Sequence, residues 1–436
     1  MQTFSKKNLS LMVLIVFISI PIFRWFFIEP LSFRFFDLNS TTTSIGQIFG
    51  ILGIMLFSIN LILSNRSHFF DRIFSGLHNF YNIHRYIGTI SFSLILFHPI
   101  FLVVKYLSVS LKDAALFLLP RSNFPITLGI IALVLMIVLL VLTLHLKIKY
   151  NLWRYSHKAM IVVFFFILGH TLLISSDISR DVFLRFYVLI FAIIGFASGF
   201  YRSFLRIFFN KDFECKVTSL NSVADNILEI EFEPKDNINF YPGQFVFVRF
   251  VGNGTSSEPH PFSISSSSSE KKFKLVIKAL GDFTSDLKNI NVGTLAKIEG
   301  PFGEFFKKEN YLSDTGREIW VAGGIGITPF LSMARSLGNT NRQIDLFYSF
   351  KDKKEGVFLD ELKGIGNINK KFRFFPWLSV EKKISASKIK ESIGEFGIDT
   401  EVYICGPLPF MLDLKNQFVD IGIDKNNINF EKFNFL

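Results

Sequence analysis

The sequence predicts a bundle of six membrane-spanning helices, followed by a small antiparallel β-barrel and an α/β domain. Three observations predict this fold class. First, 50% of the 436 residues are hydrophobic, and the apolar residues concentrate before about residue 205. Second, from residue 213 to about residue 306, apolar and polar residues alternate with the period of two that is typical of strands. Third, from Glu318 onward a buried strand, a glycine-rich loop and a helix follow one another, as in α/β domains.

Composition places the predicted domain boundaries. The long apolar runs stop at Asn210 and Lys211, so we expect a membrane domain at 1–210, a barrel at 211–312 and an α/β domain at 313–436. The net charge is +11, but Lys and Arg occur in every segment. No nucleic-acid partner is expected, because membrane flanks and nucleotide phosphates explain this charge better.

Six apolar runs are long enough to cross a bilayer core of about 30 Å as helices. The first follows Lys6 and Lys7, as the core of a signal peptide would, but it is longer than such a core and no small-residue cleavage site follows. We therefore keep it as a helix. The predicted spans are residues 9–29, 43–64, 84–105, 125–147, 155–175 and 182–201.

Basic residues near the span ends predict the orientation. One side collects Lys6, Lys7, Arg66, Arg72, Lys147, Lys149, Arg154, Lys158, Arg202 and Arg206. The other side has Arg34, Lys112, Arg121 and Arg180. Because cytoplasmic loops carry an excess of Lys and Arg, both termini and the domains after the spans are expected on the cytoplasmic side of the inner (plasma) membrane. The two cysteines, Cys215 and Cys405, then lie in the cytoplasm, and no disulfide is expected.

Four histidines lie in two of the apolar runs, His84 and His98 in the third and His157 and His170 in the fifth. Ionisable side chains are expensive in hydrocarbon and indicate function. His84 and His98 are separated by nearly four helical turns, so they share a face about 21 Å apart. Two such helices would hold two haems stacked across the membrane, with one imidazole from each helix on each iron.

The third and fifth spans run in the same direction, so we expect His84 to pair with His157 on an inner haem and His98 to pair with His170 on an outer one. A single intramembrane histidine would equally be a hydrogen-bond partner between helices, but two matched pairs favour haem. The spacing of His157 and His170 leaves them about 140° apart on an ideal helix. Either the fifth helix is locally irregular, or the two haems are laterally offset.

The predicted barrel contains five strands and three segments of note. The strands are expected at residues 213–218, 227–232, 245–250, 273–277 and 295–298. One segment, His260-Pro261-Phe262-Ser263-Ile264-Ser265, ends a loop and enters a strand. A second, Gly281-Asp282-Phe283-Thr284, precedes a short helical stretch, and such a helix start suits a phosphate. The third, Gly300-Pro301-Phe302-Gly303, is a tight turn.

The α/β domain contains a second phosphate signal. A strand at 319–322 is followed by Gly323-Gly324-Ile325-Gly326-Ile327-Thr328-Pro329 and a helix at about 330–337. Glycines let the backbone approach a pyrophosphate, and the helix start supplies N–H donors. Plain turns also use glycine, but the required strand and helix flank this one.

Two later strands of this domain also end at polar or glycine residues. The strand at 343–348 ends at Ser349, before Lys351, Lys353 and Lys354, where an adenosine ribose or its 2′-phosphate would sit. These lysines equally fit a solvated surface. The strand at 401–404 ends at Cys405-Gly406-Pro407. Ligands bind at the carboxyl ends of parallel strands, so both ends are candidate site segments.

In their order along the chain, these motifs resemble the ferric reductase and NADPH oxidase superfamily, in particular its short prokaryotic members, which are NADPH oxidase-like flavocytochromes b. The soluble half resembles the ferredoxin–NADP reductases. The resemblance covers nearly all of the chain. It implies that the barrel holds FAD, with His260–Ser263 against the flavin and the Ser263 hydroxyl near its reactive nitrogen. It also implies pyrophosphate binding by Gly281 and Thr284, with Lys278 as the basic residue of that site.

For the nicotinamide nucleotide, the resemblance implies binding by Gly323–Pro329 and Cys405–Pro407. It also implies a carboxy-terminal aromatic that shields the flavin until nicotinamide arrives, and Phe433 is our first choice, with Phe435 second. Two departures concern the acceptor. Animal NADPH oxidases place a histidine one turn after the outer ligand, where this chain has Leu102, and no arginine lies at 43–47, near the outer start of the second span.

The resemblance implies electron transfer from NADPH or NADH through FAD and two b-type haems to an acceptor across the lipid bilayer. We expect O2, giving superoxide. The alternatives are a ferric-chelate reductase and a membrane electron-transfer partner of a periplasmic protein, although the attached reductase half argues against the latter. The long regulatory insertions and the calcium-binding loop of eukaryotic oxidases have no counterpart in this sequence, so no obligatory protein activator is expected.

Overall fold

The computed structural model describes residues 6–65, 68–74, 77–107, 110–120, 122–146, 150–206, 212–252, 258–306, 316–338, 342–397 and 399–430. The chain divides into two compact units. One contains residues 1–74 and 79–210, and the other contains residues 75–78 and 211–436.

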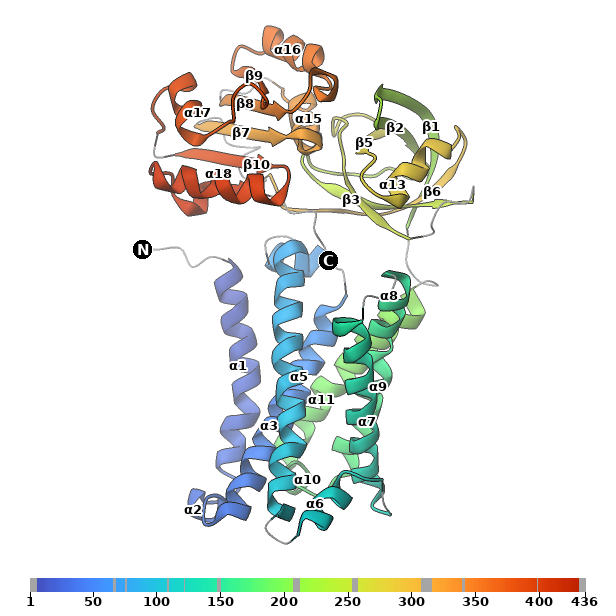
Figure 1. The fold of residues 1–436 in the computed structure, drawn as a ribbon, viewed down its shortest axis with the longest axis vertical. Coiled ribbons are helices and arrows are strands. Elements are labelled where there is room, and N and C mark those ends of the chain that lie inside the picture. The colour runs from blue at the N-terminus through green and yellow to red at the C-terminus, as the bar shows by residue number, and fades with distance from the viewer. Residues whose placement is uncertain are drawn as a thin grey trace. The chain divides into compact units, whose positions relative to one another are not determined.

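The first unit is built from helices (Figure 1). They are α1 (Lys6–Phe26), α2 (Leu31–Arg34), α3 (Leu38–Leu63), α4 (His68–Ile73), α5 (Leu77–Leu107), α6 (Leu111–Phe117), α7 (Phe124–Leu140), α8 (Tyr150–Lys158), α9 (Met160–Leu173), α10 (Asp177–Arg180) and α11 (Val182–Phe200). Two π-helical turns, η1 (Val141–His145) and η2 (Tyr201–Leu205), extend α7 and α11. Met55 of α3, Phe164 of α9 and Val188 of α11 form part of the buried core.

Five helical segments are long and apolar enough to cross a membrane, counted over the described residues. They are Leu38–Leu63, Phe80–Leu107, Phe124–Thr143, Leu152–Leu173 and Val182–Leu205. They correspond to five of the six predicted spans. The predicted first span falls on α1, whose described apolar part, Met12–Phe26, is shorter, so a sixth crossing stays a prediction.

Polar residues at the helix starts explain where several of these helices begin. The side chains of Asp37, Asn123 and Asp181 each accept a hydrogen bond from a backbone N–H in the first turn of α3, α7 and α11. Such N-caps satisfy donors that the helix itself leaves unpaired. Asp181 also pairs with Arg24 of α1 at 2.6 Å and thus ties α1 to α11.

The second unit contains two sheets (Figure 1). The first is antiparallel, in the order β4-β3-β6-β1-β2-β5. Its strands are β1 (Phe213–Ala224), β2 (Ile227–Pro234), β3 (Phe245–Val251), β4 (His260–Ser263), β5 (Phe273–Lys278) and β6 (Leu295–Phe302). A bridge between Ile264 and Leu275 connects the end of β4 with β5, the strand at the opposite edge of the sheet. The short helix α13 (Asp282–Asp286) follows β5.

The second sheet is parallel, in the order β11-β10-β7-β8-β9. Its strands are β7 (Arg317–Gly323), β8 (Gln343–Phe350), β9 (Phe372–Leu378), β10 (Thr400–Cys405) and β11 (Ile428–Phe430). The helices are α15 (Thr328–Arg335), α16 (Leu359–Ile368), α17 (Ala386–Ile393) and α18 (Leu408–Asp420). Trp320 packs in the core shared with α15 and α16, whereas Val321 packs in the core shared with α17 and α18. The helices therefore cover both faces, and the strand order reverses between β7 and β10.

Candidate functional site

The four predicted histidines lie in two pairs. His98 of α5 faces His170 of α9, with ring centres 6.3 Å apart and ring planes at 66°. His84 of α5 faces His157 of α8, with ring centres 6.2 Å apart and ring planes at 73°. The pairing is that expected from the sequence, since each pair takes one histidine from the third span and one from the fifth.

Hydrogen bonds orient these rings. The Nδ1 atoms of His98, His170 and His84 lie 2.7, 2.8 and 3.2 Å from the backbone carbonyls of Gly46, Pro125 and Asn60, respectively. A carbonyl only accepts, so each Nδ1 carries the proton and each Nε2 keeps a free electron pair. Histidines that bind metals show this arrangement. Trp153 stacks on His157, with ring centres 5.4 Å apart.

The spacing within each pair fits one metal ion. With a metal–nitrogen bond of about 2.0 Å and a ring centre about 1.2 Å behind the ligating nitrogen, two imidazoles on opposite sides of one ion have centres about 6.4 Å apart. A porphyrin leaves two axial positions on its iron, and each pair supplies two ligands. Each pair therefore has the nitrogen ligands and the spacing that a bis-histidine haem needs.

A break in the fifth span accounts for the spacing of His157 and His170. Helix α8 ends at Lys158 and α9 begins at Met160, with Ala159 between them. The backbone N–H of Val162 donates to the Ala159 carbonyl, three residues earlier, at 2.9 Å. The two histidines thus lie on separate helices and need not follow the period of a single one.

His98 and His170 also line one cavity, with walls from α3, α5, α7 and α9. A Cβ atom on Gly50 or Gly129 would lie 2.9 or 3.0 Å from the Nδ1 of His98 or His170, so both positions need glycine for the helices to approach the rings. Leu102 lines the same cavity.

Arg34 forms a buried ion pair next to the cavity at His98 and His170, which the sequence did not reveal. Its side chain is 1% exposed and pairs at 2.8 Å with Asp177, which lines the cavity at His98 and His170. It also donates to the Trp25 carbonyl at 3.0 Å and lies 3.6 Å from the Trp25 ring centre. The predicted second span began at residue 43, whereas α3 begins at Leu38. The Asp37 cap could have shown that Arg34 lies just before this span.

In the second unit, the two predicted flavin segments meet. The His260 ring stacks on Phe283, with centres 3.7 Å apart. Ser263, at the end of β4, is buried and pairs with Phe245 of β3. The Thr284 hydroxyl accepts from the backbone N–H of Gly281 at 3.1 Å and so holds the turn before α13.

Lys278 of β5 has a partner in the segment that follows β8 of the parallel sheet. Its Nζ lies 2.8 Å from the carboxylate of Glu355, which follows β8. The Tyr348 hydroxyl donates to the Glu355 carbonyl at 3.2 Å, and burial raises the pKa of Tyr348 to about 12. Tyr348 thus stays protonated at neutral pH and keeps this hydrogen bond.

The nucleotide segments also come together. Gly323 is the register partner of Ser349 on β8, and Ala322 is that of Cys405 on β10. A Cβ atom on Gly326 would collide with the Cys405 carbonyl oxygen. The glycine-rich loop and Cys405–Pro407 therefore lie in contact at the reversal of strand order, where parallel sheets bind ligands. Phe433 and Phe435 lie outside the described residues.

Family comparisons match all three parts of the chain. Residues 49–168 match a ferric reductase like transmembrane component, residues 212–305 an FAD-binding domain, and residues 320–416 an oxidoreductase NAD-binding domain. This is the ferric reductase and NADPH oxidase-like architecture. The chain thus combines a membrane domain similar to that of ferric reductases with FAD- and NAD-binding domains of oxidoreductases.

The individual relatives have low sequence identity to this chain. The chain is 28% identical to flavohemoprotein A of Dictyostelium discoideum over 230 residues, which cover 48% of this chain and 57% of the relative. It is 27% identical to the glycine betaine monooxygenase reductase subunit of Chromohalobacter salexigens over 211 residues, 44% of this chain and 56% of the relative. The chain thus spans little more than half the length of these relatives.

Among solved structures, the flavohemoglobin of Malassezia yamatoensis with bound FAD and haem has a TM-score of 0.49 and 19% identity. That match covers 90% of this chain and 97% of the flavohemoglobin.

Proposed function

We propose that this chain moves electrons from NADPH or NADH through FAD and two b-type haems to an acceptor on the other side of the membrane. Bound FAD would accept a hydride and release single electrons, which haems carry one at a time. The observation that carries the proposal is the pair of histidine pairs, with ring centres 6.2 and 6.3 Å apart, in a chain that also has FAD- and NAD-binding domains.

The histidines would hold the two irons at fixed depths. Helix α5 supplies His84 to one pair and His98 to the other. The rise of this helix therefore sets the distance between the two pairs, which is about 21 Å along the axis of α5. The carbonyls of Gly46, Pro125 and Asn60 keep the Nε2 atoms of three rings directed at the iron positions. Because both histidines of a pair would bind the same iron, the acceptor would be reduced without binding to it.

The second unit would hold FAD and NAD(P)H at adjoining strand ends. We assign the flavin to His260–Ser265, with the Ser263 hydroxyl near the reactive nitrogen, and its pyrophosphate to Gly281, Thr284 and Lys278. The nucleotide residues would be Gly323, Gly324, Gly326, Thr328, Pro329, Ser349, Cys405, Gly406 and Pro407. Phe433 would cover the flavin.

We propose dioxygen as the acceptor, reduced to superoxide. The resemblance to NADPH oxidases implies this acceptor, and the mainly apolar side chains that wall the cavity at His98 and His170, including Ile54, Leu102 and Leu133, would surround the haem that passes on the electrons. Basic residues are in excess at one end of the spans. This excess supports an orientation with both termini on the cytoplasmic side of the inner membrane.

An anaerobic reduction experiment tests the function. The purified full chain is mixed with NADPH without oxygen, the haem spectrum is followed, and oxygen or a ferric chelate is added in separate samples. We expect reduction of b-type haem, then rapid reoxidation by oxygen with superoxide detected. If oxygen does not reoxidise the haem but ferric chelate does, the protein is a ferric-chelate reductase. NADPH that leaves the haem oxidised would contradict the proposed electron path.

A further inference from the structure

Helix α15 connects the two cofactor segments of the second unit. It begins at Thr328, in the glycine-rich loop after β7, and its later turns contact the segment that follows β4. The Ser332 hydroxyl donates to the Ser266 carbonyl at 2.7 Å. The backbone N–H of Ser268 donates to the Ser336 hydroxyl, just past the end of α15, at 3.1 Å. One helix of eight residues, about 12 Å long, therefore links the proposed nucleotide loop to the proposed flavin strand.

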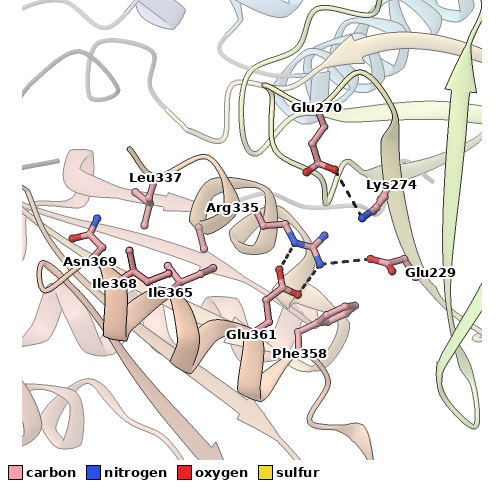
Figure 2. Close-up of a pocket in the computed structure, with 11 residues that line it drawn as sticks. Glu229, Glu270, Lys274, Arg335, Leu337, Phe358, Glu361, Ile365, Ile368 and Asn369 are labelled. Carbon is pink, nitrogen blue, oxygen red and sulfur yellow. Dashed lines mark hydrogen bonds and ion pairs between the residues drawn. The ribbon is translucent and has the colours of Figure 1, made fainter. Parts of the chain in front are cut away.

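Arg335, the last residue of α15, makes further contacts between the two sheet halves (Figure 2). Its Nη1 donates to the Ser265 carbonyl at 2.9 Å, and its Nη2 lies 3.6 Å from the carboxylate of Glu229 on β2. Its Nε and Nη2 also donate to both carboxylate oxygens of Glu361 on α16, at 2.6 and 2.8 Å. The Arg335 side chain is 12% exposed, so these bonds are largely shielded from water.

The space beside Arg335 shows why these polar contacts matter. A cavity of about 560 Å³ opens there, with Glu229 of β2, Lys274 of β5 and Glu270 of the loop before β5 on one side and residues of α15 and α16 on the other. Apolar packing joins the two sheets at α15, where Ile227 and Val276 share a core with Phe330 and Leu331, but the contacts between them at Arg335 are polar. The guanidinium group of Arg335 spans the two sheets there, and its planar fork gives the junction a defined geometry.

We propose that Arg335 is a positioning residue for hydride transfer. It holds α15 and the nucleotide loop in a fixed orientation against the flavin strand, while the reacting groups themselves are bound by other residues. The inference rests on the proposed function, in which the two electrons and one proton lost by NAD(P)H are gained together by the flavin.

The physical basis is the steep dependence of rate on geometry. A misplacement of about 1 Å lowers a rate by roughly 100-fold, even when its cause is far from the reacting atoms. Loss of Arg335 would loosen the angle between α15 and β4 without removing any group that contacts the nucleotide. The limiting rate of flavin reduction should therefore fall while nucleotide affinity is retained.

Anaerobic stopped-flow reduction of the full-length, FAD-containing protein by NADPH tests this inference. Arg335→Met should lower the limiting rate of flavin reduction by roughly 10- to 100-fold and change the apparent Kd for NADPH by less than about twofold. Arg335→Lys, which keeps the charge but not the fork, should restore only part of the rate. Arg317→Met is the matched control. Arg317 bonds to Asp345, Ile393 and Glu395 within the parallel-sheet half, so its loss should leave the limiting rate unchanged.

Two results would overturn the positioning role. One is a limiting rate for Arg335→Met equal to that of Arg317→Met, and the other is a fall in rate matched by an equal loss of affinity. If Arg335→Met does not retain FAD, Glu229→Gln is the second test variant. This change removes only the ion pair between Arg335 and Glu229. It should lower the limiting rate severalfold with FAD retained, and an unchanged rate would refute the role. A wild-type flavin that NADPH and NADH leave oxidised would overturn the proposed function itself, before any variant is compared.

Discussion

At the scale of single residues, Arg34 and Asp177 place opposite charges inside the helical unit. Their side chains are 1% and 4% exposed and lie 2.8 Å apart, and Glu29 lies 4.0 Å from the same guanidinium. Removing one partner of a buried ion pair costs more than replacing both, because the remaining charge is left without compensation.

Arg34→Met should therefore destabilise the protein by about 3–5 kcal/mol, and the double change Arg34→Met with Asp177→Leu should recover part of that loss. Thermal unfolding in detergent measures both effects. Arg24→Met is the control, because the Arg24 side chain is 44% exposed and an exposed ion pair contributes little. Equal unfolding temperatures for Arg34→Met and Arg24→Met would show that the buried pair is not stabilising.

At the scale of elements, the glycine-rich loop after β7 depends on its contact with the loop after β10. A side chain at Gly326 would collide with the Cys405 carbonyl, which is backbone and cannot rotate away. Such overpacking costs about 1–3 kcal/mol. Gly326→Ala should thus weaken NADPH binding by roughly tenfold or more, measured as the apparent Kd in flavin reduction.

Gly364→Ala is the matched control for this change, because Gly364 lies in α16 and a Cβ atom there meets nothing within 4 Å. If Gly326→Ala bound NADPH as tightly as this control does, the contact of the two loops would not shape the nucleotide site.

The elements that could be predicted from the sequence are those with strong periodicity. The spacing of apolar residues and glycines predicts five spans, the strands of the antiparallel sheet other than β4, and the strand–loop–helix at Gly323. The break at Ala159 could be expected only as one of two ways to reconcile His157 with His170, because no proline or glycine marks it. The contacts of Arg34 and Arg335 join residues far apart in the chain, and periodicity contains no information on such pairs.

At the scale of the whole molecule, the two units divide the proposed work. The second unit would receive two electrons together from NADPH or NADH, and the first would pass them singly across the membrane. The division has a consequence that can be tested. Loss of His98 and His170 should leave flavin reduction intact, because Gly323–Pro329 and His260–Ser265 belong to the second unit.

The central claim is that the four histidines hold two haems, one per pair, and the most direct measurement is the ratio of haem to FAD in wild-type protein and in His98→Ala. We predict two b-type haems per FAD in the wild type and one in His98→Ala, which should still reduce its flavin with NADPH. Wild-type protein without a haem spectrum would contradict the claim. So would a His98→Ala variant that keeps both haems, or one that loses flavin reduction together with haem.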